Sequence, residues 1–190
     1  MRMQHWPLKT IMEGITALVL RGISGVGKTV LTKLLRLALE SLGKKYKIIS
    51  KDSYRKYLSE REGYSYTKEE EENTTKWYMK EFERAAKKDD LDYIICDNTH
   101  VRQKELQIPC IAQGNISKIV VIEVGTPLSP TDSKIGDDVI KRQRKEMQES
   151  EPYVQYLYNT GITEWFTLSE KEATQKDAEE IIKECELMKC

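Results

Sequence analysis

The chain lacks an excess of charge of either sign, because its 31 Lys and Arg residues balance its 31 Asp and Glu residues. No global field therefore draws it onto nucleic acid or an anionic membrane, and any polyanion must be bound locally. It also lacks an apolar run approaching the roughly 20 residues that a membrane span requires. These absences lead us to expect a cytoplasmic protein without a membrane partner.

Cysteine, histidine and sequence repeats are equally sparse. The four cysteines, Cys96, Cys110, Cys185 and Cys190, include no close pair, which argues against a zinc site or a disulfide framework. The two histidines lie 95 positions apart, at His5 and His100, and suggest no metal site. With 190 residues and no repeat or linker, we expect one domain over 1–190, with 1–13 as an N-terminal extension.

One short segment carries a specific chemical pattern. Gly22 is followed by four residues and then by Gly27-Lys28-Thr29, which is the spacing of a phosphate-binding loop. A strand-forming run precedes it and apolar residues at helical spacing follow it, so a plain glycine-rich turn is the weaker interpretation. We expect nucleotide contacts from Gly22, Ser24, Gly25, Val26, Gly27, Lys28, Thr29 and Val30.

Two residues of this loop have distinct expected roles. Backbone N–H groups and the helix N-terminus would surround the phosphates, and Lys28 would reach the outer ones. The Thr29 hydroxyl would bind Mg²⁺ together with the phosphates and water. ATP is the expected phosphate donor, with Mg²⁺ as cofactor.

Apolar runs predict five strands, at 16–20, 44–49, 93–96, 119–122 and 165–168. Helical patterns predict four helices. The first follows the phosphate-binding loop, and the second begins at Thr67, which forms a capping box with Glu70. The third lies within 132–147, and the fourth ends the chain. Gly43 is expected to cap the first of these helices. The alternation predicts an α/β protein whose parallel sheet is covered by helices on both faces.

Polar segments follow the second and third predicted strands. These segments are Lys51-Asp52-Ser53-Tyr54-Arg55 and Asp97-Asn98-Thr99-His100. Ligands of open α/β sheets bind outside the carboxyl ends of the strands, so both segments should flank the phosphate-binding loop. There Asp52 would accept the proton of an attacking hydroxyl, and Arg55 would bind a phosphate of the acceptor. The alternatives are an N-cap for Asp52, a solvated charge for Arg55 and a turn for Asp97.

The succession of "GISGVGKT", "KDSYR", "CDNTH" and "IGDDVIKRQRKEM" resembles the phage-type 5′-hydroxyl polynucleotide kinases over residues 17 to about 150. The resemblance implies a P-loop kinase fold and transfer of the γ-phosphate of ATP to the 5′-hydroxyl of RNA or DNA. It implies catalytic roles for Lys28, Asp52 and Arg55, with Asp52 as the base. It also implies acceptor contacts from Arg55, Asp97 and Thr99, with His100 adjacent, and a separate ligase as a candidate partner.

The chain departs from that family in its lid. Members usually carry an Arg-x-x-x-Arg pair over the transferred phosphoryl group, whereas no arginine lies between Arg102 and Arg142 here. Lys134, Arg142 or Arg144 are the candidate replacements.

Two other functions stay open. One is a P-loop kinase of a small hydroxyl acceptor, such as a nucleoside, a sugar or adenylylsulfate. The other is a nucleotide-binding or nucleotide-hydrolysing module, although the sequence lacks the Asn-Lys-x-Asp element of GTPases, and Asn98 rather than Glu follows Asp97.

A set of basic residues could bind the backbone of a nucleic-acid strand: Lys44, Lys45, Lys47, Lys51, Arg55 and Lys56. Tyr54 and Tyr57 could stack on a base or serve as packing residues.

Overall fold

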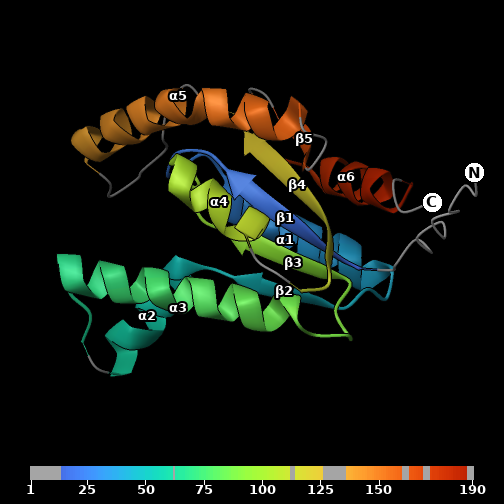
Figure 1. Cartoon of the computed structure of the whole chain (residues 1–190), viewed down its shortest axis with the longest axis horizontal. Coiled ribbons are helices and arrows are strands. Elements are labelled where there is room, and N and C mark those ends of the chain that lie inside the picture. The colour runs from blue at the N-terminus through green and yellow to red at the C-terminus, as the bar shows by residue number, and fades with distance from the viewer. Residues whose placement is uncertain are drawn as a thin grey trace, which may run out of the picture.

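One parallel five-stranded sheet forms the centre of the molecule (Figure 1). The computed structural model describes residues 14–61, 63–111, 114–125, 136–159, 163–168 and 172–187. The strand order is β2-β3-β1-β4-β5, and every neighbouring pair is parallel. The strands are β1 (Ile15–Arg21), β2 (Tyr46–Ile49), β3 (Tyr93–Asp97), β4 (Ile116–Val124) and β5 (Thr163–Leu168).

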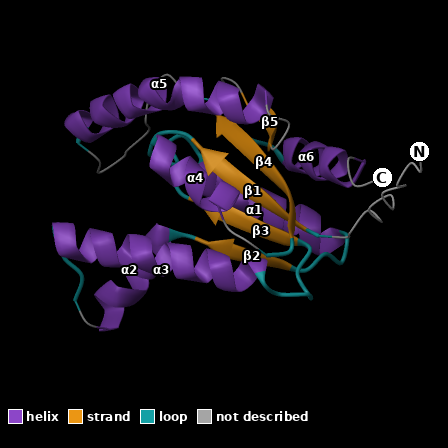
Figure 2. Cartoon of the chain, viewed as in Figure 1, coloured by secondary structure: helices purple, strands orange, loops and turns teal. Residues whose placement is uncertain are grey.

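Helices connect these strands and cover both faces of the sheet (Figure 2). They are α1 (Lys28–Ser41), α2 (Lys51–Arg61), α3 (Lys68–Ala86), α4 (Gln103–Ile111), α5 (Asp137–Asn159) and α6 (Gln175–Leu187). One core lies between the sheet and helices α1 and α6, and a second lies between the sheet and α3. The predicted five-stranded parallel sheet with helices on both faces is confirmed.

Strand β1 shows how the sequence produces this layered arrangement. All seven of its residues are buried. This burial explains why the strand is a mostly apolar run that ends in Arg21. Leu18 and Leu20 enter the core beneath α1 and α6, whereas Ala17 and Val19 enter the core beneath α3. Alternate residues therefore serve opposite layers, as expected of a central parallel strand.

Local signals set the ends of two predicted helices. The Glu70 N–H donates to Thr67 Oγ1 at 3.2 Å, which confirms the capping residue at the start of α3. Gly43 adopts a left-handed φ of 66° just beyond α1, as a residue after a helix C-terminus commonly does. Helix α4 was not expected from the sequence.

The carboxyl ends of β1, β2 and β3 lie at one edge of the sheet, because the three strands are parallel and adjacent. The loop after β1, the start of α2 and the segment after β3 therefore meet there. No helix in the described part of the chain is sufficiently long and apolar to span a bilayer.

Candidate nucleotide and acceptor site

The phosphate-binding loop connects β1 directly to α1. Gly27 has a left-handed φ of 91°, a conformation that side chains with a Cβ rarely adopt. A Cβ on Gly22 would lie 2.9 Å from the Val124 carbonyl oxygen, so this glycine is required by close backbone approach. The loop is therefore a tight backbone turn that opens a helix, the geometry in which main-chain N–H groups bind phosphate.

Lys28 is the first residue of α1, and its side chain is largely buried. Its ammonium group donates to the carbonyl oxygen of Ile23 inside the loop. Burial lowers the pKa of Lys28 to about 8, while the nearby carboxylates of Asp97 and Asp52 oppose that shift. The group is still mostly protonated at pH 7, so it can neutralise phosphate charge.

Asp97 ends β3 beside Lys28 and is itself buried. Burial raises the pKa of this carboxyl, and Thr32, Lys28 and Thr29 oppose the rise. These three neighbours belong to the phosphate-binding loop and α1, and the Asp52 carboxylate at the start of α2 also raises the pKa of Asp97. Asp97 therefore lies between the phosphate-binding loop and Asp52, and the acceptor contact expected from the sequence stays a prediction.

Thr29 and Asp97 together suit a magnesium ion that is shared with nucleotide phosphates. Among the described residues, no group of three or more His, Cys, Asp and Glu side chains is arranged to hold a metal alone. Mg²⁺ commonly binds through one or two protein oxygens together with phosphates and water. The oxygen donors at this position fit that mode.

Asp52 lies in the first turn of α2, immediately after β2. Its side chain is 85% exposed, and it is near enough to Lys28 to affect the pKa of that residue. Ser50 Oγ accepts the Ser53 N–H at 3.3 Å, so Ser50 caps this end of α2 instead of Asp52. The Lys51 N–H donates to Asn98 Oδ1 at 2.8 Å and joins the ends of β2 and β3.

Arg55 lies one turn further along α2, between two carboxylates. Its Nε and Nη2 donate to the two oxygens of Glu71 at 2.9 and 2.7 Å, and its Nη1 donates to Asp52. The Tyr64 hydroxyl also donates to Glu71. A guanidinium has five N–H donors, so two remain available for an acceptor.

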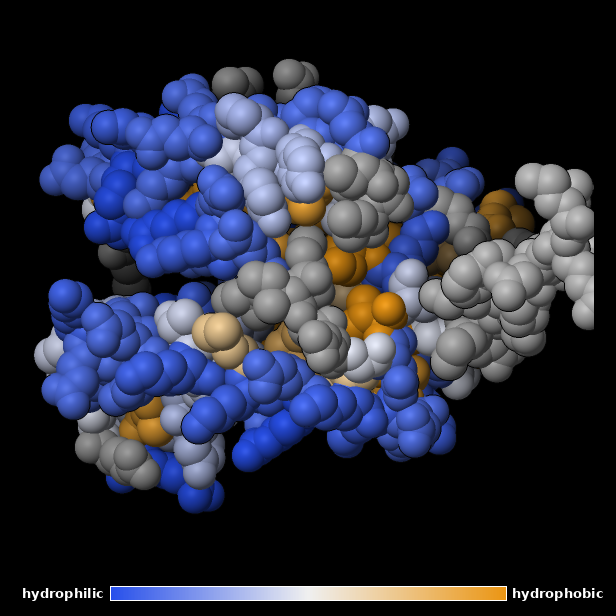
Figure 3. Space-filling model, viewed as in Figure 1, coloured by the Kyte–Doolittle hydropathy of each residue, from blue (hydrophilic) through white to orange (hydrophobic). Residues whose placement is uncertain are grey.

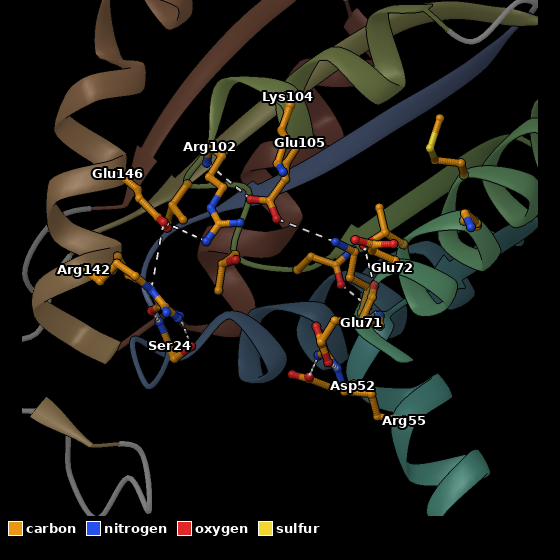
Figure 4. Close-up of a pocket in the computed structure, with 18 of the residues that line it drawn as sticks. Ser24, Asp52, Arg55, Glu71, Glu72, Arg102, Lys104, Glu105, Arg142 and Glu146 are labelled. Carbon is orange, nitrogen blue, oxygen red and sulfur yellow. Dashed lines mark hydrogen bonds and ion pairs between the residues drawn. The ribbon is translucent and has the colours of Figure 1, made fainter. Parts of the chain in front are cut away.

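A cleft of about 860 Å³ opens beside these residues, between α3 on one side and α5 on the other (Figure 4). Its lining runs from Ser24 of the phosphate-binding loop through Asp52, Arg55 and Thr99 to Arg102 and Arg142. Seven lining residues are Lys or Arg and five are Asp or Glu. Figure 3 shows strongly hydrophilic surface over both helices that flank the hollow.

The acidic residues of the cleft are mostly engaged by neighbouring cations. Glu105 pairs with Lys51 at 3.6 Å, and Glu146 pairs with Arg102 at 2.7 Å and Arg142 at 4.0 Å. Three lysines of the lining have no acidic partner within the described part of the chain. These are Lys68, Lys76 and Lys104. The cleft is therefore locally cationic although the whole chain is neutral.

His100 is not positioned for the acceptor contact that its sequence position suggested. Its side chain is 1% exposed, and the residue has a left-handed φ of 45° that turns the ring away from the cleft. Its Nδ1 lies 2.7 Å from the Leu20 carbonyl oxygen, and its Nε2 lies 3.1 Å from the Tyr78 hydroxyl. Burial lowers the pKa of His100 to about 4, so the ring is neutral and serves as a packing residue.

The basic set expected along the acceptor side divides between two ends of β2. Lys44 and Lys47 pair with Glu186 and Glu81, away from the carboxyl ends of the strands, whereas Lys51 and Arg55 line the cleft. Of the six basic residues, only Lys51 and Arg55 line the cleft. Tyr54 stacks on Trp77 with ring centroids 4.1 Å apart, which favours the packing interpretation for this tyrosine.

A family model described as chromatin associated protein KTI12 matches residues 16–176 of the chain. This match spans the phosphate-binding loop, both strand-end segments and α5. The chain belongs to the KTI12 family. A search of curated proteins returned no match.

Solved structures similar to this KTI12 family member include kinases. Shikimate kinase from Acinetobacter baumannii, in complex with shikimate, has 14% identity and a TM-score of 0.53, covering 93% of this chain and 95% of the other. The APS kinase CysC of Mycobacterium tuberculosis, in complex with AMPPNP and APS, has 15% identity and a TM-score of 0.54, covering 91% and 98%. A putative kinase from Chloroflexus aurantiacus has 12% identity and a TM-score of 0.57, covering 94% and 100%.

At these identities the likeness establishes the P-loop kinase fold alone. The comparisons support this fold and the KTI12 family, and they do not specifically support the phage-type polynucleotide kinases that the sequence resembles.

The lid residues expected from the sequence have different positions. Arg142 lines the cleft from α5, Arg144 is exposed on that helix outside the cleft lining, and Lys134 lies outside the described residues. Between the two arginines, Gln143 contacts Ser24 of the phosphate-binding loop. The sequence interpretation missed Gln143, Glu146 and Arg102, because their contacts join distant segments and follow no local motif.

Proposed function

We propose that this protein is an ATP-dependent phosphotransferase that acts on a hydroxyl group of a polyanionic acceptor, the 5′-hydroxyl end of RNA or DNA. The observation that carries the proposal is the cleft that opens from Ser24 past Asp52 and is lined by lysines without acidic partners. A phosphate-binding loop and an exposed carboxylate thus adjoin one space that suits an anionic acceptor.

The two aspartates have separate proposed tasks. Asp97 is buried beside Lys28 and Thr29 and would help to hold Mg²⁺ on the nucleotide side. Asp52 faces the cleft and would accept the proton of the acceptor hydroxyl while that oxygen forms its bond to the γ-phosphorus. The bond from that phosphorus to the bridging oxygen breaks, and Lys28 stabilises charge on the phosphates. Mg²⁺ would supply additional charge neutralisation there.

Arg55 would serve both the base and the acceptor. Its contact with Asp52 orients that carboxylate, while Glu71 fixes the guanidinium. The two unused N–H groups can bind the phosphate next to the accepting nucleoside. The description of the KTI12 family as chromatin associated names a setting and no reaction. Support for an anionic acceptor comes from the charge of the cleft.

Transfer of labelled γ-phosphate to a panel of acceptors tests this proposal. We expect kcat/KM for a 5′-hydroxyl oligonucleotide to exceed that for a free nucleoside at least tenfold, because about 1.5–3 kcal/mol comes from one charge-assisted phosphate contact. A nucleoside 3′-monophosphate should recover much of the difference. Comparable values for nucleoside and oligonucleotide, or a preference for shikimate or adenylylsulfate, would reject the polynucleotide acceptor.

A matched pair of variants links the preference to the cleft. Replacing Lys68, Lys76 and Lys104 together by Ala should reduce the oligonucleotide preference and flatten its dependence on salt. Replacing Lys33, Lys80 and Lys183, which lie outside the cleft lining, removes the same charge and should leave the preference unchanged. Equal effects of the two triple variants would show that only overall charge matters.

A further inference from the structure

Gln143 of α5 makes a reciprocal pair of hydrogen bonds with Ser24 of the phosphate-binding loop. The Ser24 N–H donates to Gln143 Oε1 at 2.7 Å, and Gln143 Nε2 donates to Ser24 Oγ at 3.0 Å. The amide orientation that places Oε1 at the Ser24 N–H and Nε2 at Ser24 Oγ satisfies both contacts. The two residues are separated by 119 positions in the sequence.

Ser24 lies where the phosphate-binding loop meets the cleft. It is the residue of this loop that lines the cleft, whereas Gly27 and Lys28 lie at the other end of the loop, at the start of α1. The inner phosphates of a nucleotide are expected at the helix N-terminus. The terminal phosphate, which must face the acceptor, is then the one that reaches the Ser24 N–H.

The Ser24 N–H has one hydrogen to donate, so a phosphate oxygen and Gln143 Oε1 compete for it. Gln143 also lies on the same helix as Arg142 and Glu146, which line the cleft and connect to Arg102. Loss of the hydrogen bond between Ser24 and Gln143 would therefore alter how the first turns of α5 are held beside the cleft.

We propose that Gln143 is a nucleotide-sensing residue: the terminal phosphate of ATP displaces its amide from the Ser24 N–H, and α5 is released from the phosphate-binding loop by ATP and not by ADP. The proposal rests on the proposed function insofar as ATP must bind this loop. It adds a residue that distinguishes the two nucleotides and couples that distinction to the acceptor cleft.

Calorimetric binding of ADP and of a non-hydrolysable ATP analogue tests the competition. In Gln143→Ala the analogue should bind roughly three- to tenfold more tightly, the equivalent of one net hydrogen bond, because its competitor is gone. ADP affinity should be unchanged. Gln143→Glu keeps an acceptor at Ser24 and places negative charge beside the terminal phosphate, so it should weaken the analogue selectively. Gln148 is exposed on the same helix, so Gln148→Ala is the control for both Gln143 variants.

Hydrogen exchange of residues 137–146 provides a readout besides affinity. In the wild-type protein the ATP analogue should raise exchange in this segment and ADP should not, whereas Gln143→Ala should show raised exchange without nucleotide. Thermal unfolding of each variant establishes that it is folded.

Other outcomes overturn the proposal. Selective weakening of the analogue in Gln143→Ala would make Gln143 a phosphate ligand, and equal or absent effects on the two nucleotides would make it a structural tie only. If neither nucleotide binds the wild-type protein, the proposed function fails together with this inference. If both bind and only the selectivity is absent, the proposed function stands.

Discussion

Burial makes Lys28 a cation that titrates close to neutral pH. Its pKa is lowered to about 8, chiefly because burial disfavours the charged form. Phosphate charge beside the ammonium favours that form again, so nucleotide binding should raise the pKa of Lys28. A group whose pKa is raised by binding contributes fully to the affinity at pH values below its pKa in the nucleotide-free protein. This contribution to the affinity falls as the pH rises through that pKa.

We therefore predict that ADP affinity is nearly constant below pH 7 and falls above pH 8, by up to tenfold per pH unit. Binding above pH 8 should take up protons, which calorimetry in buffers of different ionisation enthalpy measures directly. Lys28→Arg keeps the charge at all these pH values and should lose this pH dependence, whatever its absolute affinity. A wild-type affinity that stays constant from pH 7 to 9.5 would disprove the role of Lys28 in binding.

At the scale of elements, α5 is anchored to the sheet by one buried arginine. Arg21 ends β1 with a fully buried side chain, pairs with Glu123 of β4, and donates to the Met147 carbonyl oxygen at 2.8 Å and Ser150 Oγ at 2.9 Å. These contacts hold the middle of α5, one turn after Gln143. The residue before the phosphate-binding loop thus positions the helix that lines the cleft.

We predict that Arg21→Met lowers the free energy of unfolding by roughly 2–4 kcal/mol, because Glu123 loses its buried cationic partner and α5 loses the two hydrogen bonds from Arg21. Lys145→Met removes a cation from an exposed α5 pair with Glu149 and should cost less than about 1 kcal/mol. Urea unfolding measures both variants. Equal losses would show that the buried contacts of Arg21 do not anchor α5.

The elements that could be predicted from sequence are those whose signals are local. The glycine turn between β1 and α1, the five strands and the start of α3 depend on neighbouring residues such as Gly27 and Thr67, and each is confirmed. Helix α4 was missed because its short segment contains Pro109 and has little periodicity. Leu106 enters the core beside α3 only once the chain has folded.

The sequence predicted which segments form the site better than it predicted the direction in which their side chains point. The segment after β3 does lie by the loop, yet the left-handed backbone at His100 turns its ring toward Leu20 and Tyr78. Asp97 points to the loop, and Gln143 meets Ser24 across a long sequence separation. These outcomes depend on tertiary contacts that no local pattern specifies.

At the scale of the whole molecule, a neutral chain carries one cleft whose lining has more cations than carboxylates. The 31 basic and 31 acidic residues cancel overall, and most cleft carboxylates are already paired with cations. Attraction of a polyanion would therefore be short-ranged and sensitive to salt. The phosphate-binding loop and this cleft adjoin at Ser24, so we expect them to act on one transferred group.

The most direct test of the proposed phosphotransfer is a single-turnover reaction with γ-labelled ATP, in which the label is followed into a 5′-hydroxyl oligonucleotide and into inorganic phosphate. We predict that the label reaches the oligonucleotide, and that Asp52→Asn slows this transfer roughly 10²- to 10⁴-fold with ATP affinity preserved. The proposed phosphotransfer would be contradicted if the label appeared as inorganic phosphate at one rate with or without the oligonucleotide, unaffected by Asp52→Asn.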